Sequence, residues 1–211
     1  MRTRIKVCGV TRLDDALCAA GLGVDALGFV FWPGSPRYLS PRQAAAITAA
    51  LPPLVATVGV FVNQPLDEIR AIVAEAGLSA VQLHGNEPAS AWTSVPVRCI
   101  KAIGVGEGFD VEALASWPAS VWPLLDAHDP VRRGGTGRAV DWDLAARAAR
   151  TRPIVLAGGL DASNIRDAVE RVRPFAVDVS SGVERVPGIK DADRLRAFVG
   201  AVAAADAAQV P

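Results

Sequence analysis

Cys8 and Asp126 are the two side chains of this sequence best suited to proton transfer. Cys8 ends a short apolar run and precedes Gly9, so its thiol is expected at the open end of a strand. Asp126 ends another such run. A thiolate accepts a proton and a protonated carboxyl donates one, so the two residues predict an acid/base pair if they face one pocket. Lys6 is expected on the same face as Cys8, where its charge would favour the thiolate.

Both residues also have an ordinary interpretation. A free cysteine such as Cys8 is most often a small buried hydrophobe, and a carboxylate in the position of Asp126 can cap the loop that follows its strand. The chemical interpretation therefore requires a fold that brings the two strand ends to one pocket.

Glycine and serine gather after two consecutive apolar runs near the C-terminus. Gly158 and Gly159 follow the first run, and Ser180, Ser181 and Gly182 follow the second. Backbone N–H groups without a covering Cβ bind phosphate well, so the two clusters together predict a phosphate site. Each glycine taken alone is equally typical of a tight turn. A further cluster, Gly134–Gly137, matches either a phosphate loop or a flexible lid.

Four other charged or polar side chains lie within or just after expected strands. Arg37 is able to bind a carboxylate through two parallel hydrogen bonds, although loop arginines are common. His84 is either a ligand contact or a histidine satisfied at the rim. Lys101 and Asp178 are mid-strand charges that predict a buried ion pair, with substrate binding by Asp178 as the alternative.

Composition narrows the class of protein. Lys plus Arg number 22 and Asp plus Glu number 22, so the basic excess typical of nucleic-acid binding is missing. The strongly apolar runs are far shorter than the about 20 residues of a membrane span. Three scattered cysteines and two histidines match no metal motif. We expect a cytoplasmic protein that does not bind nucleic acid, span a membrane or hold a metal.

Short apolar or β-branched runs alternate with Ala-rich stretches of helical period along the chain. The expected strands are Ile5–Cys8, Ala26–Phe31, Thr57–Val62, Ala80–His84, Arg98–Ile103, Val121–Asp126, Pro153–Ala157 and Ala176–Ser180. The expected helices are Leu13–Gly21, Pro41–Leu51, Pro65–Ala76, Pro88–Ser94, Val111–Trp117, Asp141–Arg150, Ala162–Arg173 and Asp191–Ala204. Eight such repeats predict a (β/α)8 TIM barrel, because doubly wound sheets more often have about five to seven strands.

The chain shows no linker, charge run or low-complexity block at which a second domain would begin. Residues 1–211 are therefore expected to form a single barrel domain. The Ala-rich residues 201–211 are expected to be a frayed C-terminal tail. Ser40 followed by Pro41 is typical of a helix start, and Gly77 is typical of a helix end.

Seven strings, taken together and in order, resemble the phosphoribosylanthranilate isomerase family. They are Lys6–Thr11, Gly28–Tyr38, Val60–Asn63, Val81–Gly85, Gly134–Gly137, Leu156–Leu160 and Val177–Glu184. The resemblance implies a cofactor-free (β/α)8 isomerase of tryptophan biosynthesis. Such an enzyme converts N-(5-phosphoribosyl)anthranilate into 1-(2-carboxyphenylamino)-1-deoxyribulose 5-phosphate by an Amadori rearrangement.

The resemblance also implies roles for the residues. Asp126 matches the acid that opens the ribose ring, and Cys8 matches the base that removes the C2 proton. Arg37 matches the arginine at the anthranilate carboxylate. His84 and Asp178 match residues that line the same pocket. The phosphate site corresponds to the backbone of Gly158, Gly159, Ser180, Ser181 and Gly182.

Two other functions compete with this interpretation. A histidine-pathway isomerase uses the same Amadori chemistry, but its acid/base pair is expected to be two aspartates, so Cys8 argues against it. A non-catalytic barrel that binds a phosphorylated ligand would not depend on Cys8 or Asp126 for function. The sequence is compatible with either a monomer or a homodimer.

Overall fold

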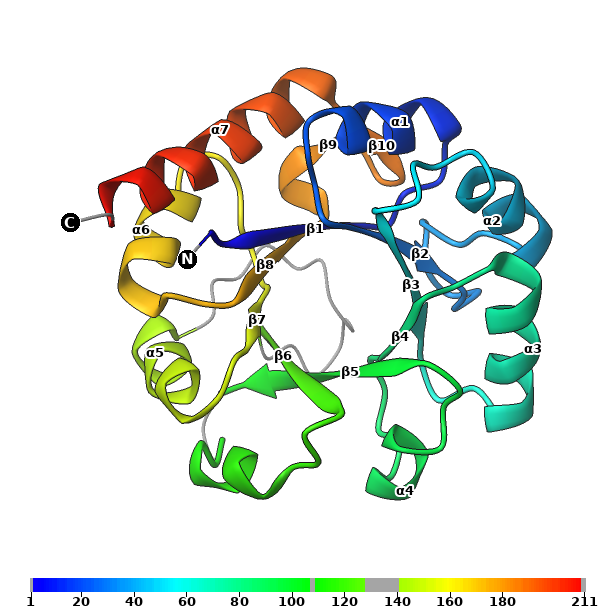
Figure 1. Cartoon of the computed structure of the whole chain (residues 1–211), viewed down its shortest axis with the longest axis horizontal. Coiled ribbons are helices and arrows are strands. Elements are labelled where there is room, and N and C mark those ends of the chain that lie inside the picture. Colours follow the sequence, from blue (N-terminus) through cyan, green and yellow to red (C-terminus); the bar gives the residue numbers. More distant parts are fainter. Residues whose placement is uncertain (1, 107–108, 128–140, 210–211) are drawn as a thin grey trace.

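The computed structural model describes residues 2–106, 109–127 and 141–209, which form a closed barrel of eight parallel strands (Figure 1). Each strand pairs with the next along the chain, and β8 pairs with β1 to close the ring. This confirms the predicted (β/α)8 fold. The strands are β1 Arg4–Cys8, β2 Ala26–Val30, β3 Ala56–Phe61, β4 Ala80–Leu83, β5 Arg98–Val105, β6 Val121–Ala127, β7 Val155–Leu156 and β8 Ala176–Val179.

Helical segments follow the strands and surround the barrel (Figure 1). They are α1 Leu13–Gly21, α2 Pro41–Thr48, α3 Leu66–Ala76, α4 Ala89–Trp92, the 3-10 helix η1 Glu112–Ser116, α5 Trp142–Thr151, α6 Ile165–Val172, the 3-10 helix η2 Ser181–Val183 and α7 Ala192–Ala208. The predicted helix signals are confirmed: Ser40 forms a capping box with Gln43, and Gly77 ends α3 with a left-handed φ of 62°.

Alternation along each strand separates two layers of side chains. On β6, Leu125 packs in the main core between barrel and helices, whereas its neighbour Leu124 belongs to a small cluster with Ala102 and Val155. Successive side chains of a strand point to opposite faces, so Asp126 shares the face of Leu124. On β1 the same rule places Cys8 and Lys6 together, as predicted.

Three segments differ from the sequence-based expectation. The expected helix Val111–Trp117 is the 3-10 helix η1, because the run before Pro118 is too short for a stable α-helix. The expected fraying from residue 201 is wrong, since α7 continues to Ala208 with Val202 and Ala205 buried. A short antiparallel hairpin, β9 Glu184–Val186 with β10 Ile189–Lys190, follows η2 and was not predicted.

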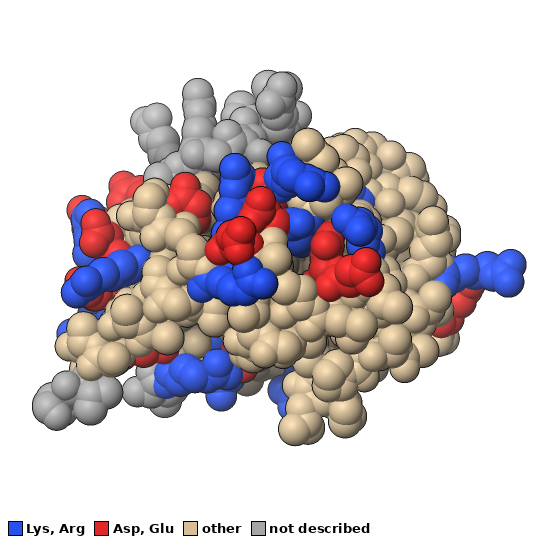
Figure 2. All heavy atoms as spheres, turned by 90° about the horizontal axis from the view of Figure 1, so that it is seen from above, with Lys and Arg blue, Asp and Glu red and all other residues tan. Residues whose placement is uncertain are grey.

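Basic and acidic side chains lie next to each other on the face seen in Figure 2. The exposed ion pairs of the protein include Arg166–Glu170 and Arg171–Asp143. Pairs of this kind contribute little to stability. Among the described residues, no helix has the length and apolar character that a membrane crossing requires.

Leu125 tests the packing between barrel and helices next to Asp126. The Leu125 side chain is fully buried, so Leu125→Ala leaves a cavity and is expected to lower the free energy of unfolding by about 2–5 kcal/mol. Leu54→Ala is the matched control: Leu54 is 94% exposed, and its loss is expected to cost about 0.5 kcal/mol or less. Urea unfolding followed by circular dichroism measures both. Equal losses for the two variants would contradict the assigned packing.

Candidate active site

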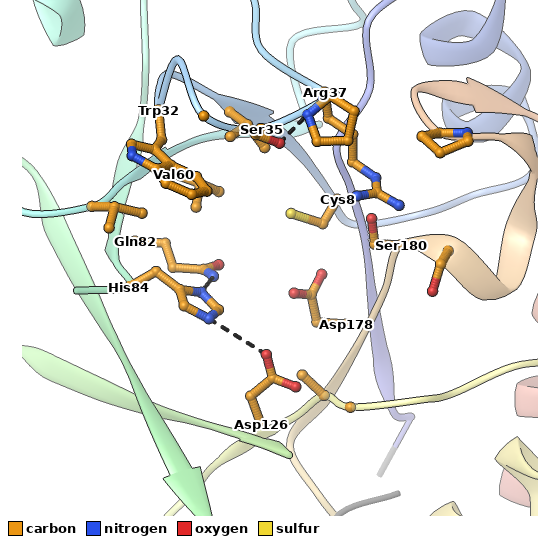
Figure 3. Close-up of a pocket in the computed structure, with 18 of the residues that line it drawn as sticks. Cys8, Trp32, Ser35, Arg37, Val60, Gln82, His84, Asp126, Asp178 and Ser180 are labelled. Carbon is orange, nitrogen blue, oxygen red and sulfur yellow. Dashed lines mark hydrogen bonds and ion pairs between the residues drawn. The ribbon is translucent and has the colours of Figure 1, made fainter. Parts of the chain in front are cut away.

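A cavity of about 510 Å³ opens at the carboxyl ends of the strands (Figure 3). Its size suits a small ligand. Cys8, from β1, and Asp126, from β6, lie on opposite sides of the cavity drawn in Figure 3. The structure therefore brings the two predicted acid/base residues to one pocket. The other predicted site residues that line this cavity are Arg37, His84, Gly158, Gly159, Asp178, Ser180 and Ser181.

The thiol of Cys8 fits beside β2 because its partner in the strand register is Gly28. A Cβ at Gly28 would lie 2.9 Å from Cys8 Sγ, which is too close for any other residue type. Burial, the largest effect, raises the pKa of the Cys8 thiol, and the charge of Asp178 raises it further. The cations Lys6 and Lys190 oppose this rise without cancelling it. Cys8 is therefore a neutral thiol at neutral pH in the ligand-free protein.

Lys6 and Asp178 form a buried ion pair on neighbouring strands. β1 pairs with β8 so that Lys6 lies beside Asp178, and Lys6 Nζ donates to Asp178 Oδ1 at 2.8 Å. Burial alone would lower the pKa of Lys6, but the charge and hydrogen bond of Asp178 oppose burial, together with Cys8 where its thiol is ionised, and the pKa of Lys6 is raised. Lys6, two residues before Cys8 on β1, therefore stays charged. Its hydrogen bond fixes the position of Asp178 on the cavity wall.

The predicted pair between Lys101 and Asp178 is wrong. Lys101 Nζ lies 2.7 Å from the carboxylate of Glu87 and also donates to the carbonyl of Gly85. Lys101 is on β5, whose neighbour β4 leads directly into the loop that carries Glu87. The hydrogen bonds from Asn63 and Lys101 outweigh burial and lower the pKa of Glu87. This second pair braces the loop that follows His84.

His84 lies between Asp126 and a glutamine that the sequence analysis did not single out. His84 Nε2 is 3.4 Å from Asp126 Oδ2, and His84 Nδ1 is 3.0 Å from the Nε2 of Gln82 (Figure 3). Gln82 is on β4 and only 1% exposed. The sequence does contain a signal for Gln82, namely an amide side chain in the middle of a buried strand. Such a side chain needs a hydrogen-bond partner, because buried polar groups are rarely left unpaired.

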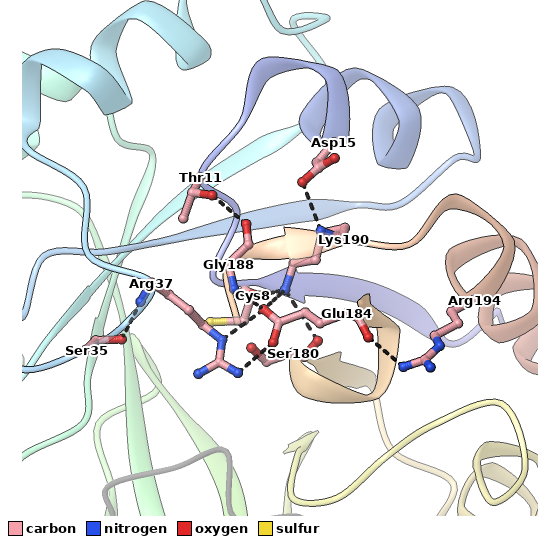
Figure 4. Close-up of polar contacts among 10 residues, drawn as sticks. All are labelled: Cys8, Thr11, Asp15, Ser35, Arg37, Ser180, Glu184, Gly188, Lys190 and Arg194. Carbon is pink, nitrogen blue, oxygen red and sulfur yellow. Dashed lines mark hydrogen bonds and ion pairs between the residues drawn. The ribbon is translucent and has the colours of Figure 1, made fainter. Parts of the chain in front are cut away.

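Arg37 is held by the unpredicted hairpin. Its Nε and Nη2 donate to the two carboxylate oxygens of Glu184 at 2.9 and 2.6 Å (Figure 4). Glu184 Oε1 also accepts from Lys190 Nζ, which donates in turn to the carbonyls of Cys8 and Ser180. These hydrogen bonds outweigh burial and lower the pKa of Glu184. The hairpin thereby joins the ends of β1 and β8 to the Arg37 loop.

The two loops predicted to bind phosphate, which follow β7 and β8, lie in close contact with each other. Gly158 and Gly159 have φ values of 89° and 63°, which L side chains rarely adopt. A Cβ at Gly182 would lie 2.0 Å from the carbonyl oxygen of Leu160, so the two loops approach as closely as only glycine permits. Gly182 does not line the main cavity; it lies in an adjoining hollow that Gly159 and Ser181 also line.

Other side chains serve packing. Trp92 contacts Trp117 in a tilted arrangement with ring centroids 4.5 Å apart, and Trp122 packs on Phe175 in a similar way. Cys99 is buried on β5, and burial raises the pKa of its thiol to about 12. His128 and the Gly134–Gly137 loop lie outside the described residues.

The sequence matches one family of known proteins over nearly its whole length. Residues 5–201 match the family described as N-(5'phosphoribosyl)anthranilate (PRA) isomerase. The chain is 50% identical over 196 residues to an N-(5'-phosphoribosyl)anthranilate isomerase of Pelobacter propionicus, covering 93% of both chains.

Two solved structures are similar along nearly the whole chain. A phosphoribosyl anthranilate isomerase from Thermus thermophilus aligns with a TM-score of 0.88 and 41% identity, over 96% of this chain and 99% of the other. Another isomerase of the same name, solved in complex with reduced 1-(O-carboxyphenylamino)-1-deoxyribulose 5-phosphate, aligns with a TM-score of 0.85, 41% identity and the same coverage.

The raised pKa of Cys8 predicts how the cysteines react with iodoacetamide. Alkylation needs the thiolate, so a raised pKa delays the reaction to higher pH. The rate at Cys8 is expected to keep rising beyond about pH 9, the ordinary pKa of a thiol, while Cys18, which is partly exposed, is modified first. Cys99 should be the slowest. Mass spectrometry of the labelled peptides measures each rate, and a Cys8 rate that levels off below pH 8 would contradict the neutral thiol.

Proposed function

Because the chain belongs to the N-(5'-phosphoribosyl)anthranilate isomerase family, we propose that it converts N-(5'-phosphoribosyl)anthranilate into 1-(2-carboxyphenylamino)-1-deoxyribulose 5-phosphate in tryptophan biosynthesis. In the structure, one feature of the cavity supports this proposal most strongly. Cys8 and Asp126 line one cavity from opposite sides, next to the loops of β7 and β8. A sugar anchored there by its phosphate would lie between an acid and a base.

Asp126 is the proposed acid of the first step. In its protonated form it donates a proton to the ring oxygen of the ribose, and the C1–O bond breaks as the amine nitrogen supplies its electron pair. The product is an open-chain Schiff base with a positive nitrogen. General acid catalysis of this kind contributes about 10²–10⁴-fold to the rate.

Cys8 is the proposed base of the second step. Because the free thiol is neutral, it must first lose its proton to solvent. The positive nitrogen of the Schiff base, like the charges of Lys6 and Lys190, favours the resulting thiolate. The thiolate removes the proton from C2, and the electrons of the C–H bond neutralise the nitrogen to give an enolamine. The enolamine then becomes the ketose. Substrate and product are isomers, and the protons that Asp126 gives and Cys8 takes balance over the cycle, so the reaction requires no oxidant or reductant.

Binding at the two ends of the substrate positions this chemistry. We propose that the phosphate lies at the backbone of Gly158, Gly159 and the segment Ser180–Gly182, where close loops and the start of η2 favour an anion. Arg37 would meet the anthranilate carboxylate with its Nη1 and Nη2 hydrogens, because Nε and one side of Nη2 already bind Glu184. Asp178 would contact the sugar from the wall beside Cys8.

The enzyme is expected to act in the cytoplasm, as a monomer or a homodimer and without a cofactor. A solved relative binds a phosphorylated product analogue, which supports a small phosphorylated substrate for this chain. The rival histidine-pathway activity fits the site less well, because a thiol rather than a second aspartate lies opposite Asp126.

Substitution of the two reacting groups tests the assigned roles. Cys8→Ser and Asp126→Asn are each expected to lower kcat by roughly 10²–10⁴-fold while the fold is retained. The assay follows the decay of phosphoribosylanthranilate fluorescence, with the substrate made in place from anthranilate and phosphoribosyl pyrophosphate.

Cys18→Ser provides the matched control, because this cysteine lies on α1 and does not line the cavity. Its activity should equal that of the unmodified protein. Full turnover by both Cys8→Ser and Asp126→Asn would reject the acid/base assignment and would favour a barrel that only binds its ligand.

A further inference from the structure

We propose that Gln82 is a positioning residue that selects the tautomer of His84 and thereby keeps the acid proton of Asp126 available to the substrate. The inference rests on the proposed isomerase function and deepens it. Gln82 is on β4, is only 1% exposed and lines the cavity two residues before His84. Neither the sequence motifs nor the acid/base chemistry assigns it a role.

The first step is the contact between Gln82 and the imidazole. The amide nitrogen Nε2 of Gln82 is 3.0 Å from Nδ1 of His84. An amide NH₂ group donates and does not accept hydrogen bonds, so Nδ1 must present its lone pair. A neutral imidazole carries one hydrogen, which must then be on Nε2. Burial of Gln82 holds this arrangement in place.

The second step is the contact between His84 and the acid. Nε2 of His84 faces Oδ2 of Asp126 at 3.4 Å (Figure 3). With its hydrogen on Nε2, the ring donates to the carboxyl and has no lone pair on that side. It therefore cannot accept the acid proton of Asp126. In the other tautomer, Nε2 would be a base next to the acid and would compete with the ring oxygen of the sugar.

The third step concerns the other end of the amide. Oε1 of Gln82 is buried and, within the described part of the chain, forms no hydrogen bond. Figure 3 shows this oxygen on the cavity side of the side chain. An unpaired buried acceptor costs about 1–3 kcal/mol unless a ligand satisfies it. In the ligand-free protein this oxygen is closed off, so a hydroxyl or amine hydrogen of the bound substrate would reach it only after a small shift of the amide. Such a contact would hold Gln82 in the orientation that sets His84.

The tautomer is measured by NMR of the substrate-free protein labelled with ¹⁵N-histidine, at alkaline pH where the ring is neutral. The chain has only two histidines, so His84→Asn assigns the signals by their loss. We expect His84 to carry its hydrogen on Nε2. A hydrogen on Nδ1 in the unmodified protein would overturn the proposal.

Two substitutions of Gln82 test whether this residue determines the tautomer of His84. In Gln82→Glu a carboxylate accepts at Nδ1, so the hydrogen should move there, and kcat should fall about 10-fold or more as part of the acid contribution is lost. KM should change less, because an acceptor oxygen remains. Gln82→Met has nearly the same size but neither donor nor acceptor, and should give a mixture of tautomers with a lowered kcat. An unchanged tautomer in both variants would overturn the proposal.

Gln64→Met is the matched control. Gln64 is a partly buried amide after β3 that binds the backbone of Val62 and Phe31 and does not line the cavity. Its loss should leave the His84 tautomer unchanged. The NMR measurement does not involve the substrate, so an Nε2–H tautomer in a protein without isomerase activity would refute the proposed function alone.

Discussion

The pairing of β8 with β1 is the constraint on which the site depends. Four consecutive residue pairs, from Arg4 with Ala176 to Val7 with Val179, join the two ends of the barrel. The expected phosphate loops follow β7 and β8, whereas the thiol of Cys8 comes from β1. Only closure of the sheet brings these parts together. Closure also removes exposed sheet edges, so the same hydrogen bonds stabilise the fold and assemble the cavity.

Buried charges near the cavity are compensated in pairs. Lys6 is paired with Asp178, Lys101 with Glu87, and Lys190 with Glu184, which also holds Arg37. Each pair joins neighbouring or consecutive segments at the carboxyl ends of the strands. Pairs of this kind contribute little net stability, but removal of one partner leaves a buried charge and is costly. Their role is to fix the geometry around Cys8 and Asp126 rather than to make the fold more stable.

The fold was predictable because its signals are local. Alternating apolar runs and helical periods give the order of elements, and Ser40 and Gly77 mark helix ends through their own side chains or lack of one. Strand ends of a barrel converge, so the predicted fold by itself places Cys8 and Asp126 at one pocket. Residues 128–140 lie outside the described structure, so the Gly134–Gly137 loop stays a prediction.

The details that escaped prediction depend on contacts between distant segments. Lys101 and Asp178 are both inward charges, but the sheet register places Lys6, not Lys101, beside Asp178. The hairpin that carries Glu184 and Lys190 is too short and too charged to show a strand period. Gln82 reads as an ordinary strand residue until its amide is seen against His84. In each case the partner, and not the residue type, reveals the role.

A crystal structure of this protein with reduced 1-(2-carboxyphenylamino)-1-deoxyribulose 5-phosphate tests the central claim most directly. The account predicts Cys8 Sγ and the Asp126 carboxyl on opposite sides of the ribulose chain, each in contact with it. The phosphate should lie against Gly158, Gly159 and the segment Ser180–Gly182. A phosphate bound elsewhere, or a sugar that only one of the two groups reaches, would contradict the account.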